Sequence, residues 1–341
     1  MSLPNPAPVL DLIHGFRHSK TMFAAVSLGV FECLHESPAR ASELAARLGT
    51  DAGATERLLD ACAALGLLRK RGGIYQNDPV VETYLCAASP DSLLGYVRYS
   101  DAALYPMWGN LADAVREGGH RWTQTFGLEG PIFSHFFRTD EAMRDFLLGM
   151  YGFGRLTAPK VVSAFDLGRF RRLVDLGGAM GHLAIAACER YPELRAGVFD
   201  LPRVAVLARE QVAQSAACGR IDVIAGDFFR DELPEADLYA VGQILHDWPD
   251  EKIDPLLNKV FARLPTGGGL LVAEKLLEED GVGPIAANMQ SLNMLVVTEG
   301  RERSLSEYTA LLKRAGFGDV QGRRTGVPLD AVLAVKGAIY G

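Results

Sequence analysis

Leu173–Ala184 reads LVDLGGAMGHLA, and this stretch decides the fold. An apolar run ends in a glycine-rich turn and an apolar-periodic segment follows, which predicts a strand, a turn and a helix. The glycines at 177, 178 and 181 lack the Cβ atoms that would keep a ligand away from the backbone, and the first turn of the helix offers unpaired N–H groups. We therefore expect a small polar ligand on this turn.

The acidic residues around the turn distinguish the type of nucleotide site. A dinucleotide turn reads G-x-G-x-x-G, whereas here Asp175 precedes a turn with small residues at alternate positions. Asp200 ends a second predicted strand, and Asp227 with Phe228 follows a third. A single aspartate after a strand usually caps the next helix, but three after successive strands meet at one edge of a parallel sheet. One acid for a ribose, one for an adenine edge and an aromatic wall indicate a nucleoside site.

After residue 160, strand and helix patterns alternate, which is typical of a doubly wound parallel sheet. The predicted strands are 172–176, 194–199, 221–225, 237–242 and 268–273. Two further segments, 319–324 and 331–335, have no helix between them and are predicted to form an antiparallel hairpin. The predicted fold class is therefore α/β, a Rossmann-like doubly wound sheet with an antiparallel C-terminal hairpin.

The first 90 residues follow a different pattern. Helical apolar spacing recurs in three segments, 9–31, 41–50 and 54–68. Gly72-Gly73 then marks a small hairpin, and this order predicts an α-rich winged-helix domain. The predicted division of the chain is a winged-helix domain at 1–90, a helical connection at 91–160 that contributes to an acceptor pocket, and a catalytic, ligand-binding domain at 161–341.

A winged helix raises the alternative of a DNA-binding regulator that senses a small ligand. Residues 1–80 contain eight Lys or Arg and eight Asp or Glu, so the domain is neutral where a DNA reader is basic. The apolar faces of residues 8–34 also exceed what a small domain needs for its own core. We expect this domain to form a homodimer rather than to bind nucleic acid.

Further motifs along the chain give a family resemblance. The glycine-rich turn is followed by Asp200, by Asp227-Phe228-Phe229 and by His246-Asp247-Trp248. In this order they resemble the class I S-adenosylmethionine-dependent methyltransferases, more narrowly the plant caffeate-type and acetylserotonin-type O-methyltransferases, and most of all acetylserotonin O-methyltransferase-like proteins. The likeness covers nearly the whole chain and also rests on Trp108–Gly118, Ala236–Tyr239, Ser291–Gly300 and Arg301–Ser304.

The resemblance implies S-adenosyl-L-methionine as the cofactor, S-adenosyl-L-homocysteine as the product, and no metal. Two residues depart from the family pattern. Ala179 stands where relatives have glycine, so we expect its methyl group to crowd the ligand, and Gln243 stands where relatives often have Lys or Arg. The residues that the resemblance assigns to the cofactor are Asp175, Gly177, Gly178, Gly181, Asp200, Asp227, Phe228, Gln243 and Trp248.

His246 is the expected general base for methyl transfer to a hydroxyl group. It follows the fourth predicted strand and so reaches the same sheet edge as Asp200. A neutral imidazole, with an ordinary pKa of about 6.5, accepts the proton as the oxygen attacks. Such a base needs an acidic partner that fixes its tautomer, and the resemblance assigns that role to Glu274 and Glu302. Glu299 is a neighbour that we expect to be a solvated charge.

The acceptor is expected to be a small aromatic or indole-like molecule. Aromatic and methionine side chains in 91–160 suit the lining of such a pocket, although most of them are expected to be core contacts between helices. The resemblance places the acceptor against Tyr99, Met150, Phe153, Asn288, Met289 and Met294. An S-methyltransferase acting on a small thioether acid remains an alternative, because sulfur carries no proton and needs no base.

Composition fits a two-domain enzyme. The 341 residues, 48% of them hydrophobic, exceed what a single core usually holds. The net charge of −7 argues against a nucleic-acid partner. No apolar run reaches the roughly 20 residues of a membrane helix, and the first residues lack a secretory signal pattern. Five cysteines without a C-x-x-C pair predict reduced thiols. We expect a cytoplasmic protein with no membrane partner.

Overall fold

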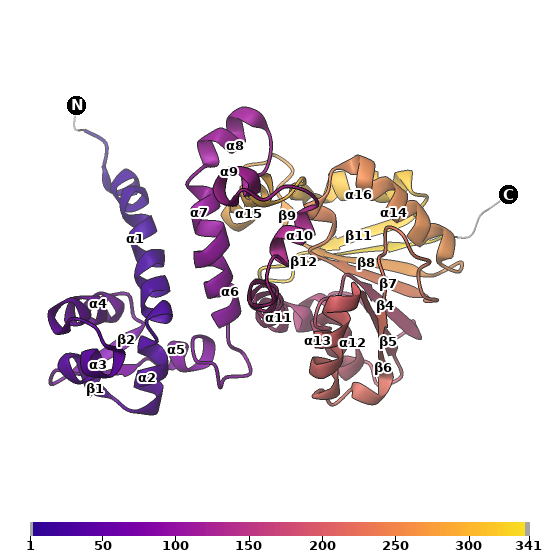
Figure 1. The fold of residues 1–341 in the computed structure, drawn as a ribbon. Helices are drawn as coiled ribbons and strands as arrows, with labels where there is room; N and C mark the ends of the chain where they lie inside the picture. Colours follow the sequence, from indigo (N-terminus) through magenta and orange to yellow (C-terminus); the bar gives the residue numbers. More distant parts are fainter. Residues whose placement is uncertain (1–2, 338–341) are drawn as a thin grey trace. The chain divides into compact units, whose positions relative to one another are not determined.

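The structure is a computed structural model that describes residues 3–337. The chain folds into two compact units (Figure 1). The first comprises the chain up to Tyr105 together with Thr139–Gly152, and the second comprises Pro106–Arg138 together with the chain from Phe153 onward. The segment 91–160 is therefore divided between the two units.

The first unit combines helices with a small sheet. Strands β1 (Ala39–Arg40), β2 (Leu68–Arg71) and β3 (Ile74–Asn77) pair antiparallel in the order β1-β3-β2. Both glycines of the β2–β3 turn have positive φ, a conformation that glycine adopts without strain. The arrangement confirms the predicted α-rich winged-helix domain. The helices are α1 (Ala7–Ser27), α2 (Val30–Glu36), α3 (Ala41–Leu48), α4 (Ala52–Ala64), α5 (Pro79–Tyr84), α6 (Leu94–Tyr99), the π-helix η1 (Ser100–Leu104) and the first part of α11 (Asp140–Val161).

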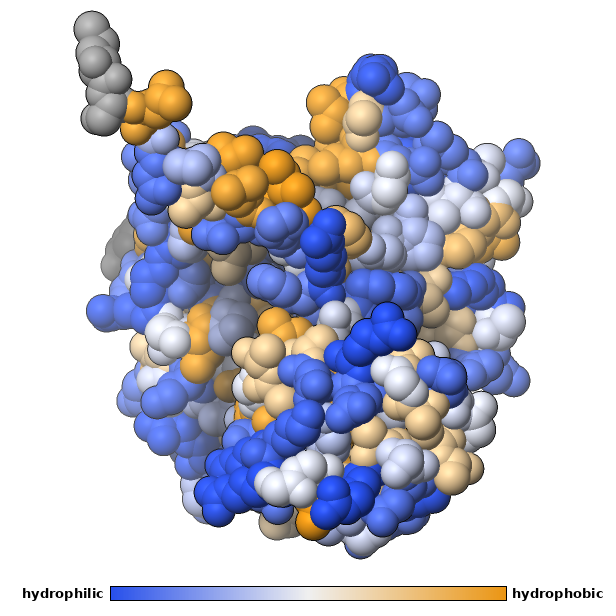
Figure 2. Space-filling model, turned by 90° about the vertical axis from the view of Figure 1, so that its left-hand side faces the viewer, coloured by the Kyte–Doolittle hydropathy of each residue, from blue (hydrophilic) through white to orange (hydrophobic). Residues whose placement is uncertain are grey.

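The core of the first unit leaves one face of α1 uncovered. Phe31, Leu44, Leu59 and Tyr75 are among the fully buried residues of that core. On α1, by contrast, apolar residues at helical spacing are 46–82% exposed, and Figure 2 shows hydrophobic side chains gathered on this side of the molecule. These exposed residues are Val9, Leu10, Leu12, Ile13 and Phe16.

A seven-stranded sheet forms the centre of the second unit, in the order β11-β12-β8-β7-β4-β5-β6. Five neighbouring strands are parallel, whereas β12 runs antiparallel to both β8 and β11. The predicted doubly wound sheet with its C-terminal hairpin is confirmed, with every strand within one residue of its predicted ends. The strands are β4 (Arg172–Leu176), β5 (Arg195–Asp200), β6 (Ile221–Ala225), β7 (Leu238–Gly242), β8 (Gly269–Glu274), β11 (Asp319–Arg323) and β12 (Asp330–Val335).

The strand order determines where a ligand binds. From β4 the chain proceeds to β5 and β6 on one side, and later to β7 and β8 on the other. Ligands of such sheets bind at the carboxyl ends of the strands where this order reverses, which here is between β4 and β7. Figure 1 shows α12 (His182–Arg190) and α13 (Pro202–Ala213) on one face of the sheet, with α14 (Asp250–Arg263) and α16 (Leu305–Arg314) on the other.

Shorter elements complete the chain. Strands β9 (Leu276–Leu277) and β10 (Arg303–Ser304) form a small parallel pair beside the main sheet. Within residues 3–337, no helix has the length and apolar character needed to cross a membrane. The remaining elements are α7 (Tyr105–Trp108), α8 (Leu111–Glu117), α9 (Trp122–Phe126), α10 (Ile132–Phe136), α15 (Ile285–Val297) and the 3-10 helices η2 (Cys218–Arg220) and η3 (Leu245–Asp247).

Candidate active site

The glycine-rich turn after β4 leaves no room for side chains at two positions. A Cβ atom on Gly177 would lie 2.5 Å from Cδ1 of Ile244, and one on Gly178 would lie 2.6 Å from Oδ2 of Asp175. Ala179 has a φ of 47°, a left-handed conformation that costs an L-residue about 1–2 kcal/mol. Alanine in place of the glycine of relatives at position 179 therefore strains the backbone of the turn.

Two carboxylates flank the turn, of which Asp175 is buried and Asp200 is partly buried. Asp200, at the end of β5, accepts hydrogen bonds from the backbone N–H groups of Ala179 (2.8 Å) and Leu201 (2.7 Å). Asp175 is buried near the end of β4, and Gly181 is the N-cap of α12 with a positive φ. Burial raises the pKa of Asp200 to about 6. Burial together with repulsion from Asp200 raises the pKa of Asp175 to about 7. Hydroxyl or N–H donors of a ligand would stabilise the charged forms of both acids.

Aromatic rings form a wall beside the turn. Cε1 of Phe228 lies 3.2 Å from the position that a Cβ on Gly177 would take, and the Phe228 ring centroid is 4.7 Å from that of Phe229. The rings of Phe229 and Phe133 approach Trp248 at 5.5 Å and 5.7 Å. The buried Nε1 of Trp248 has no hydrogen-bond partner among residues 3–337. Phe133, which comes from α10, was not predicted, because nothing in its local sequence links it to Trp248.

Asp227 follows β6, and 30% of its side chain is exposed. One of its oxygens accepts a hydrogen bond from the backbone N–H of Phe229 at 2.9 Å. This local contact is of the kind expected for a single aspartate that stabilises the turn after a strand. The carboxylate still has lone pairs available for a ligand, since each ionised oxygen accepts more than one hydrogen bond.

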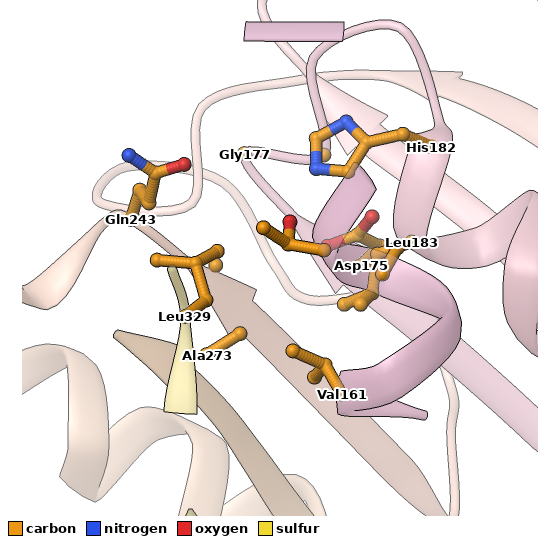
Figure 3. Close-up of a pocket in the computed structure, with 12 residues that line it drawn as sticks. Val161, Asp175, Gly177, His182, Leu183, Gln243, Ala273 and Leu329 are labelled. Carbon is orange, nitrogen blue, oxygen red and sulfur yellow. The ribbon is translucent and has the colours of Figure 1, made fainter. Parts of the chain in front are cut away.

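A cavity opens at the switch point of the sheet (Figure 3). Four residues predicted to bind the cofactor line it: Asp175, Gly177, Gly178 and Gln243. Figure 3 shows Gln243 and His182 reaching the cavity from different elements. The lining residues that the sequence did not predict come from α11, α12, the ends of β7 and β8, and the segment before β12, so only the fold brings them together. They are Thr157, Ala158, Val161, His182, Leu183, Gly242, Ala273 and Leu329.

His246 lies on η3, after β7, and is 3% exposed. Its Nδ1 is 2.7 Å from Oε1 of Glu302 and 3.2 Å from Oε2 of Glu274. The other oxygen of Glu274 accepts hydrogen bonds from the backbone N–H groups of Ile244 and Leu245, both at 3.0 Å. The structure therefore brings together the three residues predicted to be catalytic. Glu302 orients the imidazole, while Glu274 also holds the backbone that carries it.

The surrounding carboxylates change the protonation of His246. Burial by itself would lower the pKa of His246, but the negative charges of Glu274, Glu302 and Asp247 raise it to about 10. Burial in turn raises the pKa of Glu274 to about 7 and that of Asp247 to about 6. The ordinary value of about 6.5 used for the sequence prediction is thus too low. His246 in this cluster is a stronger base than a free imidazole.

A buried arginine supports the segment that carries His246. Arg303, 1% exposed, donates hydrogen bonds to the carbonyl oxygens of Leu245 (3.1 Å) and Trp248 (3.1 Å) and to the carboxylate of Asp250 (2.9 Å). Gly300 packs against the same segment, because a Cβ there would lie 2.2 Å from the carbonyl oxygen of His246. Arg303 lies in a segment that carries the family resemblance, but the sequence did not predict that it supports the backbone around His246.

The geometry of the histidine cluster favours proton transfer over metal binding. Nδ1 of His246 and the carboxylates of Glu274 and Glu302 offer one nitrogen and two oxygens within 4.8 Å of one another. The 2.7 Å between Nδ1 and Glu302 is a hydrogen-bond length, shorter than the roughly 3.3 Å between two ligand atoms on a tetrahedral zinc ion. Glu299 does not join the cluster and instead forms a partly exposed ion pair with Lys252.

The residues predicted to contact the acceptor fall in both units. Tyr99 on α6 is buried, and its ring meets that of Phe146 edge-on at 5.3 Å. On α15, Met294 is 4% exposed, whereas Met289 is 48% exposed. The first unit contains Tyr99 and Met150, and the second contains Phe153, Asn288, Met289 and Met294.

Two protein-family descriptions match this chain. The O-methyltransferase domain matches residues 108–318, more than half of the chain. The O-methyltransferase dimerisation domain matches residues 10–87, within the first unit. The two matches include the glycine-rich turn, the histidine cluster and the winged-helix region.

Individual proteins of this kind are similar along nearly their whole length. Acetylserotonin O-methyltransferase of Bos taurus is 44% identical over 333 residues, which are 96% of each chain. The Gallus gallus protein of the same name is 42% identical and covers 98% of each chain. The crystal structure of human N-acetylserotonin methyltransferase in complex with S-adenosylmethionine superimposes with a TM-score of 0.93, at 39% identity, over 99% of this chain and 100% of that chain.

These findings confirm the predicted family, the fold class and an O-methyltransferase activity that depends on S-adenosylmethionine. They give no support to the alternatives of a thioether S-methyltransferase or a DNA-binding regulator. The same site geometry, with a glycine-rich turn, carboxylates after successive strands and a histidine after the fourth, lies inside the matched domain. The chain therefore belongs to the O-methyltransferase family.

Proposed function

We propose that this protein transfers a methyl group from S-adenosylmethionine to the hydroxyl group of a small aromatic or indole-like acceptor, with His246 as the general base. The observation that carries the proposal is the buried imidazole whose Nδ1 lies between Glu302 and Glu274, at 2.7 Å and 3.2 Å. His246 follows β7 and Glu274 ends β8, and both strands also border the cavity at the glycine-rich turn.

The residues around the turn suit S-adenosylmethionine, which supplies the activated methyl group as a sulfonium. Gly177 and Gly178 line the cavity with backbone atoms, and a Cβ on either would clash with Ile244 or Asp175. In the proposed assignment, Asp200 binds the ribose hydroxyls, Asp227 and Phe228 bind the adenine, and Trp248 covers its ring with an indole Nε1 that has no partner among residues 3–337. The remaining assigned residues, Asp175, Gly181 and Gln243, complete the surface near the turn.

His246 is arranged to take a proton through Nε2. Glu302 accepts a hydrogen bond from Nδ1 in the tautomer that leaves the lone pair on Nε2 for the acceptor. A phenolic hydroxyl has a pKa of about 10, and the carboxylates raise the pKa of His246 to about 10 as well. Proton transfer from such a hydroxyl to His246 therefore costs less free energy than transfer to an ordinary imidazole. With an ordinary imidazole it would be uphill by about 5 kcal/mol, at 1.36 kcal/mol per pKa unit.

The acceptor proposed first is N-acetylserotonin, a hydroxyindole, because relatives at 42–44% identity over nearly the whole chain carry the name acetylserotonin O-methyltransferase. We propose that the residues of the second unit assigned to the acceptor contact the flat ring, namely Phe153 on α11 and Asn288, Met289 and Met294 on α15. A flat apolar acceptor suits aromatic and methionine side chains, which adapt to a ring face.

We also propose that the protein acts as a homodimer. The first unit matches an O-methyltransferase dimerisation domain, and the exposed apolar residues of α1 form a face without cover within residues 3–337. Such faces in soluble proteins commonly mark protein interfaces. The five unpaired cysteines are in keeping with a reducing compartment, and we place the enzyme in the cytoplasm.

Transfer of a labelled methyl group tests the proposal. Purified protein is incubated with S-[methyl-14C]adenosylmethionine and N-acetylserotonin, and in parallel with other hydroxyindoles, simple phenols and a thioether acid. We expect label in the methyl ether of a hydroxylated aromatic acceptor. Label in the thioether alone, or none in any acceptor despite cofactor binding, would overturn the proposal.

A further inference from the structure

Lys275 is a cation next to the catalytic cluster to which the mechanism above gives no role. It directly follows Glu274 and is partly buried. Its Nζ lies over the ring of Phe153, 5.0 Å from the centroid. Among the residues from 3 to 337, no hydrogen bond or ion pair reaches this ammonium. Burial lowers the pKa of Lys275 from its usual range, although the charges of Glu302 and Glu274 partly offset this effect.

Sequence spacing places Lys275 beside one wall of the cavity at the glycine-rich turn. Ala273 on β8 and Thr157 on α11 both line that cavity. Lys275 comes two residues after Ala273, and Phe153 comes four residues before Thr157. Residues two apart along an extended segment share a face, as do residues four apart on a helix. The contact between Lys275 and Phe153 therefore lies next to the cavity, on the faces that carry Ala273 and Thr157.

Successive side chains of an extended segment point to opposite faces, so Glu274 at the end of β8 and Lys275 directly after it point in different directions. Glu274 turns towards η3, where it accepts hydrogen bonds from Ile244 and Leu245. Lys275, the next residue, meets Phe153 on α11 instead. Glu274 thus binds the backbone next to His246, and the neighbouring Lys275 places a positive charge over Phe153.

Within residues 3–337 the Lys275 ammonium has no direct ion-pair or hydrogen-bond partner of the kind that buried or partly buried charges normally have, and Glu302 and Glu274 attract it only without such contact. The ring of Phe153 compensates only in part, because a cation over an aromatic face gains about 0.5–2 kcal/mol. A carboxylate on a bound ligand would supply both the missing charge and the missing hydrogen-bond acceptor.

We propose that Lys275 is a carboxylate-binding residue of this active site, an inference that rests on the proposed function. Two bound molecules can supply that carboxylate. One is the amino-acid end of the cofactor, and the other is an acidic group on the acceptor. The second source would make the enzyme selective for acidic hydroxyindoles or phenols over neutral ones.

The test compares Lys275→Met with Lys275→Arg, which keeps the charge, and with Lys160→Met, which removes an exposed lysine from α11. Calorimetry measures the affinity for S-adenosylhomocysteine and for 5′-methylthioadenosine, which has no carboxylate. Steady-state assays compare 5-hydroxyindole-3-acetate, an acidic acceptor, with neutral N-acetylserotonin. Lys275→Gln, which keeps a polar group, replaces Lys275→Met if that variant does not fold.

If Lys275 binds the carboxylate of the cofactor, Lys275→Met weakens S-adenosylhomocysteine binding about tenfold to a hundredfold and leaves methylthioadenosine binding unchanged. If Lys275 binds a carboxylate of the acceptor, Lys275→Met leaves S-adenosylhomocysteine binding unchanged. The KM for the acidic acceptor then rises by a similar factor relative to the KM for the neutral acceptor. Lys275→Arg and Lys160→Met stay near the wild type in either case.

Equal effects on carboxylate-bearing and carboxylate-free ligands, or no effect on any of them, would overturn the inference. Failure of the proposed function is distinguishable, because it shows in the wild-type protein as a lack of S-adenosylhomocysteine binding or of methyl transfer to every acceptor.

Discussion

Nδ1 of His246 lies 2.7 Å from Oε1 of Glu302, and both side chains are buried. The contact fixes one tautomer of the imidazole and leaves Nε2 for the acceptor. Glu274 adds a second carboxylate at 3.2 Å from the same nitrogen. The two acids together make His246 strongly basic, and they also keep it protonated over a wide pH range.

Glu302→Gln should change the pH dependence of catalysis as well as its rate. The base must be neutral to accept a proton, and the wild-type pKa of about 10 makes kcat/KM rise with pH up to that value. Removing one negative charge lowers the pKa of His246, so the rising limb shifts down by about 1–3 pH units. The maximal rate should fall about tenfold, because Gln holds the imidazole less firmly. A kcat/KM profile from pH 6 to 10.5 checks this, and an unshifted limb would argue against coupling between the two residues.

Arg303→Met should destabilise the protein and slow catalysis. The substitution removes the hydrogen bonds to the carbonyl groups of Leu245 and Trp248 and the ion pair with Asp250. Each buried carbonyl oxygen that loses its donor costs about 1–3 kcal/mol of unfolding free energy, whereas Asp250 is 40% exposed and keeps its ion pair with Arg314. Arg301→Met is the matched control, since Arg301 is half exposed and its ion pair contributes about 0–1 kcal/mol. Urea denaturation measures both, and similar losses in the two variants would contradict the supporting role of Arg303.

Asp200→Ala should weaken cofactor binding without abolishing it. A hydrogen bond to a charged group contributes about 1.5–3 kcal/mol, and the variant also releases the N–H groups of Ala179 and Leu201. Calorimetry with S-adenosylhomocysteine gives the affinity. Asp222→Ala, on the neighbouring strand β6 and half exposed, serves as the control. An affinity equal to that of the wild type in a folded Asp200→Ala protein would remove Asp200 from the ribose assignment.

Ile13→Glu should convert the proposed dimer into a monomer. Ile13 lies in the exposed apolar face of α1 at 54% exposure, and a charge buried in an apolar interface is strongly unfavourable. Val206→Glu introduces the same charge at a 52% exposed apolar position on α13 and should leave the mass unchanged. Light scattering coupled to size exclusion decides between the two states. A wild-type protein with monomer mass, or an Ile13→Glu variant with unchanged dimer mass, would refute this interface.

The strands of the main sheet were largely predictable because each short apolar run of the parallel part ends at a glycine or an acidic residue. The run from Leu173 to Ala184 and the position of His246 together define the edge where the ligand binds. The cluster of His246 with Glu274 and Glu302 also followed from the family resemblance, and the distances place these three side chains in contact.

Other parts of the site depend on tertiary contacts that have no local signal. Phe133 meets Trp248 from more than a hundred residues away in sequence, and Arg303 looks like a surface charge until its burial is known. The basicity of His246 was also beyond the sequence, because it arises from three carboxylates that only the fold brings around the ring.

The most direct test of the account is turnover by His246→Gln, measured together with S-adenosylhomocysteine affinity. Gln has a similar reach but takes no proton at neutral pH. We predict an affinity within about twofold of the wild type and a kcat about a hundred to ten thousand times lower with a neutral phenolic or indolic acceptor. With an acceptor whose hydroxyl group is already ionised at the assay pH, the loss should shrink to about tenfold or less. A His246→Gln enzyme that methylates the neutral acceptor at the wild-type rate would contradict general-base catalysis by His246.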